Sequence, residues 1–194
     1  RDLVRSRGLG DVYKRQDVEL TLIPYYAWAH RGSGNMMVWL PQEVSATSPS
    51  MPATLASESR VDASHKTTAL SAINDRLVPV DENDRSMAYY HWWPKKNSTE
   101  WITYEFPKPS KVSSSTVYWF DDEPWGGCRV PQSWKLYYKD EQGGWTPVSA
   151  AGTYGTKKGV PNTVEFTPVQ TTAMKLEVVL PKDNSAGVFE WEVE

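Results

Sequence analysis

The sequence predicts an all-β fold, a β-sandwich or a β-barrel, and two observations carry that prediction. Short segments in which apolar and polar residues alternate follow one another at a spacing of about 8–12 residues, with turn-forming residues between them. No stretch beyond residue 16 keeps the roughly 3.6-residue apolar period of an amphipathic helix. The 194 residues are enough for one domain of ordinary size and an additional piece.

Seven segments after residue 99 carry the alternation of β-strands. In EWITYEF, Ile102, Tyr104 and Phe106 fall on one side and the residues between them on the other, and AMKLEVVL repeats the pattern. The sequence DEQGG, at residues 140–144, predicts a hairpin turn. The predicted strands lie, in order, within EWITYEFPKP, VSSSTVYWFDD, SWKLYYKD, GWTPVSA, NTVEFTPVQ, AMKLEVVLP and GVFEWEVE.

The chain divides into four predicted parts. Residues 1–16, RDLVRSRGLGDVYKRQ, have no apolar period and no signal-peptide core, and they resemble a translated sequencing adapter, so we treat them as a non-native tail. Residues 17–41 place two strands around the loop HRGSGN, a β-hairpin that needs a larger sheet to be stable. Residues 42–58 are rich in Ser, Thr, Ala and Pro and predict a linker, and residues 59–194 form the main β-domain.

Composition limits the classes of function. The formal net charge of -3 gives no basic face for nucleic acid, and no apolar run approaches the ~20 residues that cross a bilayer. The single cysteine, Cys128, allows no internal disulfide and no multi-cysteine zinc site. Ten tryptophans favour carbohydrate binding by stacking on sugar rings, and the alternative is that a sandwich core uses them.

The order of motifs in the main domain resembles a known family. The motifs SHKTTALSAINDR, HWWP, TEWITYEFPKPSKVSSSTVYWFDD, CRVPQSWKLYYKD and AGVFEWEVE are similar to the discoidin, or coagulation factor 5/8 type C, group of galactose-binding-like domains. The resemblance runs from about Glu58 to Glu194 and implies a jelly-roll β-sandwich. Many members of the group are carbohydrate-binding modules of family 32 type, so the resemblance also implies a glycan ligand.

The upstream segment resembles a second family. LTLIPYYAWAHRGSGNMMVWLP looks like the last strands of the β-domain in bacterial proteins of glycoside hydrolase family 127, which includes β-L-arabinofuranosidases. The resemblance implies a C-terminal fragment of a polysaccharide-degrading enzyme whose catalytic barrel, with a glutamate and cysteines around zinc, lies upstream. With Cys128 as its only cysteine, this chain cannot build that zinc site, so we expect no catalytic residue in it. The matching positions are Pro24, Tyr25, Trp28, Arg31, Gly32, Met36, Val38 and Trp39.

The acid-rich segment SAINDRLVPVDENDRS, residues 71–86, points to a structural Ca²⁺ site, because Ca²⁺ takes about six to eight oxygen ligands. The family resemblance implies that Asp75 and Glu190 are its side-chain ligands, and Asp81 and Asp84 are weaker candidates. The family usually has glycine after the first aspartate, whereas this chain has Arg76, a departure at the tight turn. The alternative is an ordinary solvated acidic loop.

The stretch AYYHWWPKK, residues 88–96, concentrates aromatic side chains. Strand alternation puts Tyr89, His91 and Trp93 on one side and the pair Tyr90 and Trp92 on the other, so one side can be core and the other free. The family resemblance implies that Trp93 is the buried tryptophan, which leaves Trp92 and His91 as ligand-binding residues. Sugar recognition needs such a flat apolar face beside fixed polar groups. The alternative for Trp92 is packing against the upstream domain.

A second binding segment is WFDDEPWGGCRVP, residues 119–131, in which a strand ends in two carboxylates before a glycine loop. Asp121 and Asp122 are adjacent, and adjacent side chains of a strand point to opposite faces, so they make poor partners for glycosidase chemistry. We therefore predict that Asp122 and Arg129 hydrogen-bond sugar hydroxyls, or each other, while Trp125 stacks on the ring. The alternative for Arg129 is a structural salt bridge.

Together these observations predict an all-β, galactose-binding-like jelly-roll β-sandwich preceded by a detached β-hairpin from an upstream β-domain. Its predicted function is that of a non-catalytic carbohydrate-binding domain that tethers or buttresses the catalytic barrel of a secreted bacterial glycoside hydrolase. The expected partners are a plant or host glycan and the upstream catalytic domain in cis, and the expected location is periplasmic or extracellular. The alternative is a purely structural domain without sugar binding, in a parent protein that is a β-L-arabinofuranosidase-like hydrolase.

Overall fold

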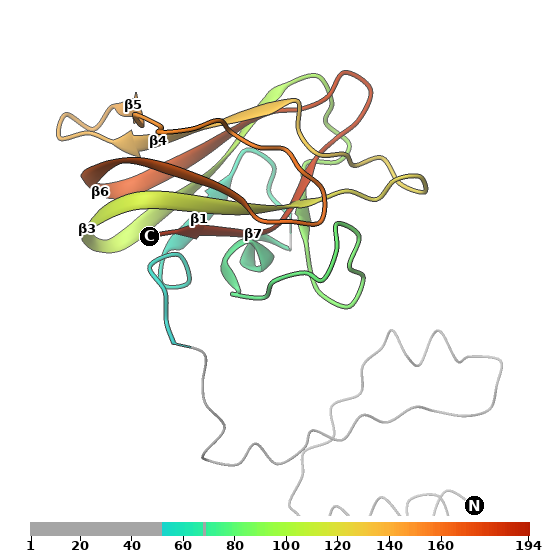
Figure 1. Ribbon diagram of the computed structural model, residues 1–194, viewed down its shortest axis with the longest axis horizontal. Helices are drawn as coiled ribbons and strands as arrows, with labels where there is room; N and C mark the ends of the chain where they lie inside the picture. Colours follow the sequence, from blue (N-terminus) through green and yellow to red (C-terminus); the bar gives the residue numbers. More distant parts are fainter. Residues whose placement is uncertain (1–51, 68) are drawn as a thin grey trace, which may run out of the picture. The chain divides into compact units, whose positions relative to one another are not determined.

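A computed structural model describes residues 52–67 and 69–194 of the protein (Figure 1). The non-native tail predicted at residues 1–16, the hairpin predicted at residues 17–41 and most of the linker predicted at residues 42–58 lie outside this part. The described chain enters through a turn in which the N–H of Glu58 donates to the carbonyl oxygen of Thr54 at 3.1 Å.

The described residues form antiparallel strands and one short 3-10 helix, which confirms the all-β prediction. The sheet runs in the order β2-β7-β3-β6-β4-β5, and β1 pairs with β3. No helix in this part of the chain is long and apolar enough to cross a membrane. The elements are β1 (Arg60–Ala63), the helix η1 (Leu70–Asn74), β2 (Tyr90–His91), β3 (Thr99–Phe120), β4 (Ser133–Lys139), β5 (Trp145–Pro147), β6 (Asn162–Val179) and β7 (Gly187–Val193).

Two long strands join the layers of the sandwich, as the curved β3 and β6 of Figure 1 show. The first half of β3 pairs with β1 and with the second half of β6, whereas its second half pairs with β7 and with the first half of β6. The sequence predicted two strands in each of these places. The expected break in β3 is a shift of register between Glu105 and Ser110, where Pro107 and Pro109 cannot donate to the ladder.

The alternation read from the sequence defines the core. Ile102, Tyr104 and Phe106 of β3 are buried, as predicted, and so are the inward-facing residues of β6. Tyr104 stacks on Trp191 at a centroid distance of 4.1 Å, and its hydroxyl donates to the carbonyl oxygen of Trp191 at 2.7 Å. In residues 52–67 and 69–194, four tryptophans have at most 2% of their surface exposed, so the core does use tryptophan heavily: Trp92, Trp119, Trp134 and Trp191.

The prediction for the two tryptophans of HWWP was wrong, because Trp92 is buried and Trp93 is 44% exposed. Tyr90 of β2 pairs with Val188 of β7 and points into the core, and strand alternation carries Trp92 to the same side. The two rings meet edge to face at 5.1 Å, and the Trp92 indole N–H donates to Ser64 Oγ at 3.1 Å. Trp92 therefore belongs to the core and cannot contact a ligand in solvent.

Candidate functional site

Aromatic and charged side chains at the end of β3 lie near those in and around β2, and together they form what we call the loop-end site. One part is the loop that follows β3, from Asp121 to Val130, and the other is the segment from Arg85 to Trp93. The members of the loop-end site are Arg85, Tyr89, His91, Trp93, Asp122, Trp125 and Arg129.

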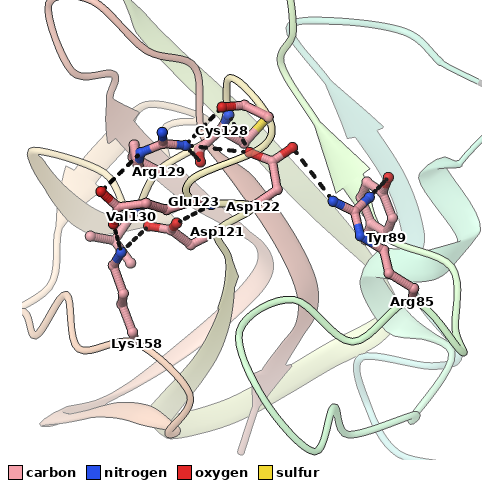
Figure 2. A network of polar contacts seen from close by, with 10 residues as sticks. Arg85, Tyr89, Asp121, Asp122, Glu123, Cys128, Arg129, Val130 and Lys158 are labelled. Carbon is pink, nitrogen blue, oxygen red and sulfur yellow. Dashed lines mark hydrogen bonds and ion pairs between the residues drawn. The ribbon is translucent and has the colours of Figure 1, made fainter.

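The two carboxylates that directly follow β3 have different partners, as the sequence predicted (Figure 2). Asp121 is buried and accepts the N–H groups of Glu123 and Val130, each at 3.0 Å, while the Lys158 ammonium lies 3.0 Å from Oδ2. Both of its oxygens thus have partners inside the fold. Asp121 therefore anchors the loop and is unsuited to transfer protons to a substrate.

Asp122 lies at the centre of the loop-end site. Its Oδ1 accepts the Cys128 N–H at 2.8 Å and lies 3.5 Å from Arg129 Nη1, and its Oδ2 lies 3.7 Å from Arg85 Nη2. Arg129 Nη1 also donates to the carbonyl oxygens of Gly126 at 3.0 Å and of Cys128 at 2.6 Å. The predicted pairing of Asp122 with Arg129 is present, and Figure 2 shows Asp122 between two arginines that come from separate segments.

Two glycines bring the loop close to its neighbours. A Cβ atom at Gly126 would lie 1.7 Å from Asp122 Oδ2, and one at Gly127 would lie 2.3 Å from Cζ3 of Trp93. The bare backbone at Gly127 thus lets the half-exposed indole of Trp93 lie against the loop that holds Asp122 and Arg129. Trp93 also carries the Lys96 ammonium 5.2 Å from its ring centroid. Trp125, in the same loop, is 89% exposed.

Alanine at position 126 is expected to destabilise the protein by about 1–3 kcal/mol, because the added Cβ displaces the Asp122 carboxylate from its hydrogen bonds. Gly152→Ala is the matched control, since no atom lies within 4 Å of a Cβ there. Chemical denaturation of both variants measures the difference. Equal stability of Gly126→Ala and the wild-type protein would show that the carboxylate is not held as described.

His91 adds a titratable group to the loop-end site. Its ring lies 6.0 Å from that of Tyr89, and its Nδ1 is buried with no hydrogen-bond partner among the described residues. Burial lowers the pKa of His91, the nearby His65 lowers it further, and Asp122 opposes the shift. The imidazole is therefore neutral near pH 7, and because Nδ1 is buried, Nε2 is the ring nitrogen that remains for a ligand.

Three members of the loop-end site were missed from the sequence: Trp93, which was assigned to the core, Tyr89 and Arg85. Tyr89 stacks on Phe120 at a centroid distance of 3.9 Å, and the Arg85 guanidinium lies 5.4 Å from the Tyr89 centroid and donates to its hydroxyl at 2.7 Å. Arg85 lies in the acid-rich segment, far from Asp122 in sequence, so only the fold brings the two together. The alternation that groups Tyr89 with His91 and Trp93 was the one signal for Tyr89.

Cys128 is a buried thiol, and burial together with Asp122 raises its pKa to about 12. Because the thiolate is the reactive form, a thiol with this pKa is inert at neutral pH. The structure thus agrees with the sequence interpretation of Cys128 as a small buried residue.

The two residues predicted to bind Ca²⁺ lie together at the C-terminal end of η1. Glu190 Oε2 accepts the Arg76 N–H at 3.1 Å, and Asp75 Oδ1 accepts the N–H of Leu77 at 2.9 Å. Glu190 Oε1 is buried and has no hydrogen-bond partner among the described residues. Arg76 adopts φ 68°, so the turn for which the family uses glycine forms with arginine.

These contacts fit a hard cation in part. No three His, Cys, Asp or Glu side chains gather as a metal site in residues 52–67 and 69–194, so backbone carbonyls and water would have to complete the shell. Burial raises the pKa of Glu190 to about 9, the Arg76 N–H opposes this, and the charge of Asp75 adds to it. The weaker candidates, Asp81 and Asp84, accept backbone N–H groups of their own loop.

The fold and the site define a class: an antiparallel β-sandwich that presents exposed aromatic and charged side chains on its loops. Residues 53–192 match the F5/8 type C domain, and the chain therefore belongs to that family. Residues 6–41 match the glycoside hydrolase family 127 C-terminal domain, so both resemblances read from the sequence are confirmed. That match starts within residues 1–16, and the boundary at residue 16 stays a prediction.

Solved structures of carbohydrate-binding modules share the fold. The family 32 module of NanJ from Clostridium perfringens, in complex with galactose, is 18% identical with a TM-score of 0.54. The match covers 72% of this chain and 95% of the NanJ module. CpGH89CBM32-5 from the same organism, in complex with GalNAc-β-1,3-galactose, is 15% identical with a TM-score of 0.55. The match covers 73% of this chain and 99% of that module. Chitosan-binding module 1 from Paenibacillus sp. IK-5 is 16% identical with a TM-score of 0.54, and the match covers 74% of this chain and 99% of the chitosan-binding module. These similarities confirm the predicted galactose-binding-like sandwich.

Proposed function

We propose that the domain is a non-catalytic carbohydrate-binding module whose ligand contacts the loop-end site. The observation that carries the proposal is the half-exposed indole of Trp93, which lies on Gly127 beside the loop that holds Asp122 and Arg129. A sugar ring needs an apolar plane for its C–H face and fixed donors and acceptors for its hydroxyls. Trp93 supplies the plane, and neutral His91, Asp122 and Arg129 supply the polar groups.

Trp93 takes the stacking role that the sequence interpretation gave to Trp92. Trp125, exposed in the same loop, is the second aromatic side chain available to a ligand. Asp122 and Arg129 each hydrogen-bond to the backbone of the loop, and they also contact each other. These contacts fix the orientation of both side chains before a ligand binds. Fixed polar groups lose less freedom on binding, so this arrangement favours recognition.

The family supports a wider role for the chain. Galactose and GalNAc-β-1,3-galactose are bound by the similar modules of Clostridium perfringens, and these sugars are the first ligands to test. The match to a glycoside hydrolase family 127 C-terminal domain supports a parent protein that is a hydrolase, extracellular or periplasmic, with its catalytic barrel upstream in cis. The module would then hold that barrel near its glycan substrate. We also propose Ca²⁺ as the ion held by Asp75 and Glu190, where it would neutralise the two carboxylates and fix the turn after η1.

Calorimetric titration of the chain with galactose and with GalNAc-β-1,3-galactose tests the proposal. Trp93→Ala is expected to weaken binding at least about tenfold, because a central tryptophan carries a large share of the binding energy. Lys108→Ala is the control, an exposed substitution on β3 away from the loop-end site. Unchanged affinity in Trp93→Ala would place any sugar site elsewhere.

A further inference from the structure

The outer face of the sheet carries a second group of aromatic and polar side chains, apart from the loop-end site. It spans four neighbouring strands, β3, β6, β4 and β5, and its members alternate with buried residues such as Ile102, Leu176 and Leu136. Cross-strand pairing sets them side by side, Trp101 with Glu177 and Lys175 with both Thr103 and Tyr137. We call this group the sheet-face patch, and its members are Trp101, Thr103, Tyr137, Trp145, Lys175 and Glu177.

The polar groups of the sheet-face patch are fixed and balanced in charge. Lys175 Nζ lies 3.1 Å from Glu177 Oε2 and 4.2 Å from the Tyr137 ring centroid. The Tyr137 hydroxyl donates to the other Glu177 oxygen at 3.1 Å. The Lys175 ammonium is thus matched by one carboxylate within the patch, and at its border Lys135 lies opposite Glu177 and Lys139 lies opposite Trp145.

The sheet-face patch is hollowed. Trp101, Thr103, Trp145 and Lys175 line an open hollow of about 330 Å³, in which the Lys175 ammonium lies 5.6 Å from the Trp145 ring centroid. Trp145 is 38% exposed although it is a large apolar side chain. Two indoles at the borders of a hollow, with a hydroxyl and an ammonium between them, are the mixture of apolar planes and fixed polar groups that binds polyhydroxylated ligands.

We propose that the sheet-face patch is a second carbohydrate-contact surface, which takes an uncharged polysaccharide chain. The aromatic planes would receive the C–H faces of its sugar rings, and Thr103 and the Lys175–Glu177 pair would receive its hydroxyls. The Lys175 ammonium is already paired with Glu177, so this pair can receive hydroxyls more readily than a carboxylate. Two separate contacts on one domain raise the affinity for a long chain above that for a single sugar. This proposal goes beyond the loop-end site and does not depend on it.

The test compares three variants of the 194-residue chain, each with one tryptophan substituted, on neutral and acidic polysaccharides. Affinity electrophoresis in galactan, arabinan and xylan is expected to show Trp145→Ala binding at least one of them about tenfold more weakly than the wild-type chain. Trp145→Phe retains an aromatic plane and is expected to keep most of the affinity. The Trp145→Ala variant is expected to bind galactose with the affinity of the wild-type chain, whereas Trp93→Ala is expected to bind galactose more weakly.

A second readout locates the contact without depending on any variant's stability. In ¹⁵N spectra, the indole N–H signals of Trp101 and Trp145 are expected to shift when the neutral polysaccharide that binds is added as an oligosaccharide. Three outcomes would overturn the proposal: no binding to any of the three neutral polysaccharides, wild-type affinity in Trp145→Ala, or weakening confined to polygalacturonate. Loss of galactose binding in Trp93→Ala would still support the loop-end site, so the two proposals fail separately.

Discussion

Trp92→Ala is expected to lower the free energy of unfolding by about 3–5 kcal/mol, the usual cost of deleting a buried large aromatic side chain. Trp92 has none of its surface exposed, packs edge to face on Tyr90 and donates its indole N–H to Ser64 Oγ. The variant leaves a cavity in the core and removes a partner from Ser64. Denaturant unfolding measures the change as a lower midpoint with the slope retained.

Trp93→Ala is the matched control, because the two tryptophans are neighbours in sequence and differ in burial. Trp93 is 44% exposed, and its removal is expected to cost little stability while it weakens glycan binding. The reverse pattern, a stable Trp92→Ala variant and an unstable Trp93→Ala variant, would restore the assignment read from the sequence and remove the plane of the loop-end site.

Calcium is expected to raise the melting temperature of the chain, and chelator is expected to reverse the rise. A ligand that binds only the folded state stabilises it by mass action, by about 4 kcal/mol at a thousand times its dissociation constant. Glu190 Oε1, which is buried and has no hydrogen-bond partner among the described residues, and the adjacent Asp75 would supply oxygen ligands for such a site. Differential scanning calorimetry with and without Ca²⁺ makes the measurement.

The Glu190→Gln variant separates the effect of Ca²⁺ binding on stability from the effect of the buried carboxyl itself. The folded-state pKa of Glu190, about 9, lies above the ordinary 4.5, so its contribution to stability is fully present below pH 4.5 and is lost as the pH rises toward 9. Without Ca²⁺ near pH 7, glutamine mimics the protonated carboxyl, and the variant is expected to be at least as stable as the wild-type chain. With Ca²⁺ its melting temperature should not rise. If Ca²⁺ does not change the melting temperature of the wild-type chain, the proposed Ca²⁺ site is wrong.

Alternation predicted most of the fold because each strand has one apolar side. It placed Ile102, Tyr104 and Phe106 in the core, and it grouped Trp93 with His91. It did not select the buried side of HWWP, since both sides are aromatic. The pairing of Tyr90 with Val188 decides that question, and this contact joins residues almost a hundred positions apart.

The candidate site was predictable where its residues share one loop. Asp122, Trp125 and Arg129 lie within a single loop, so the sequence placed them together, and the structure brings Arg129 to Asp122. Arg85 reaches Asp122 from another segment, and Trp93 reaches Gly127 only because glycine leaves room for the ring. Such contacts depend on how loops meet, which local patterns do not encode.

Carbohydrate binding by the loop-end site can be tested with a glycan array probed with the 194-residue chain. We expect the chain to bind at least one array glycan, and Trp93→Ala to lose that signal while Lys108→Ala keeps it. If the folded chain binds none of the plant and host glycans on the array, the loop-end site is not a carbohydrate-binding site. The domain would then be purely structural.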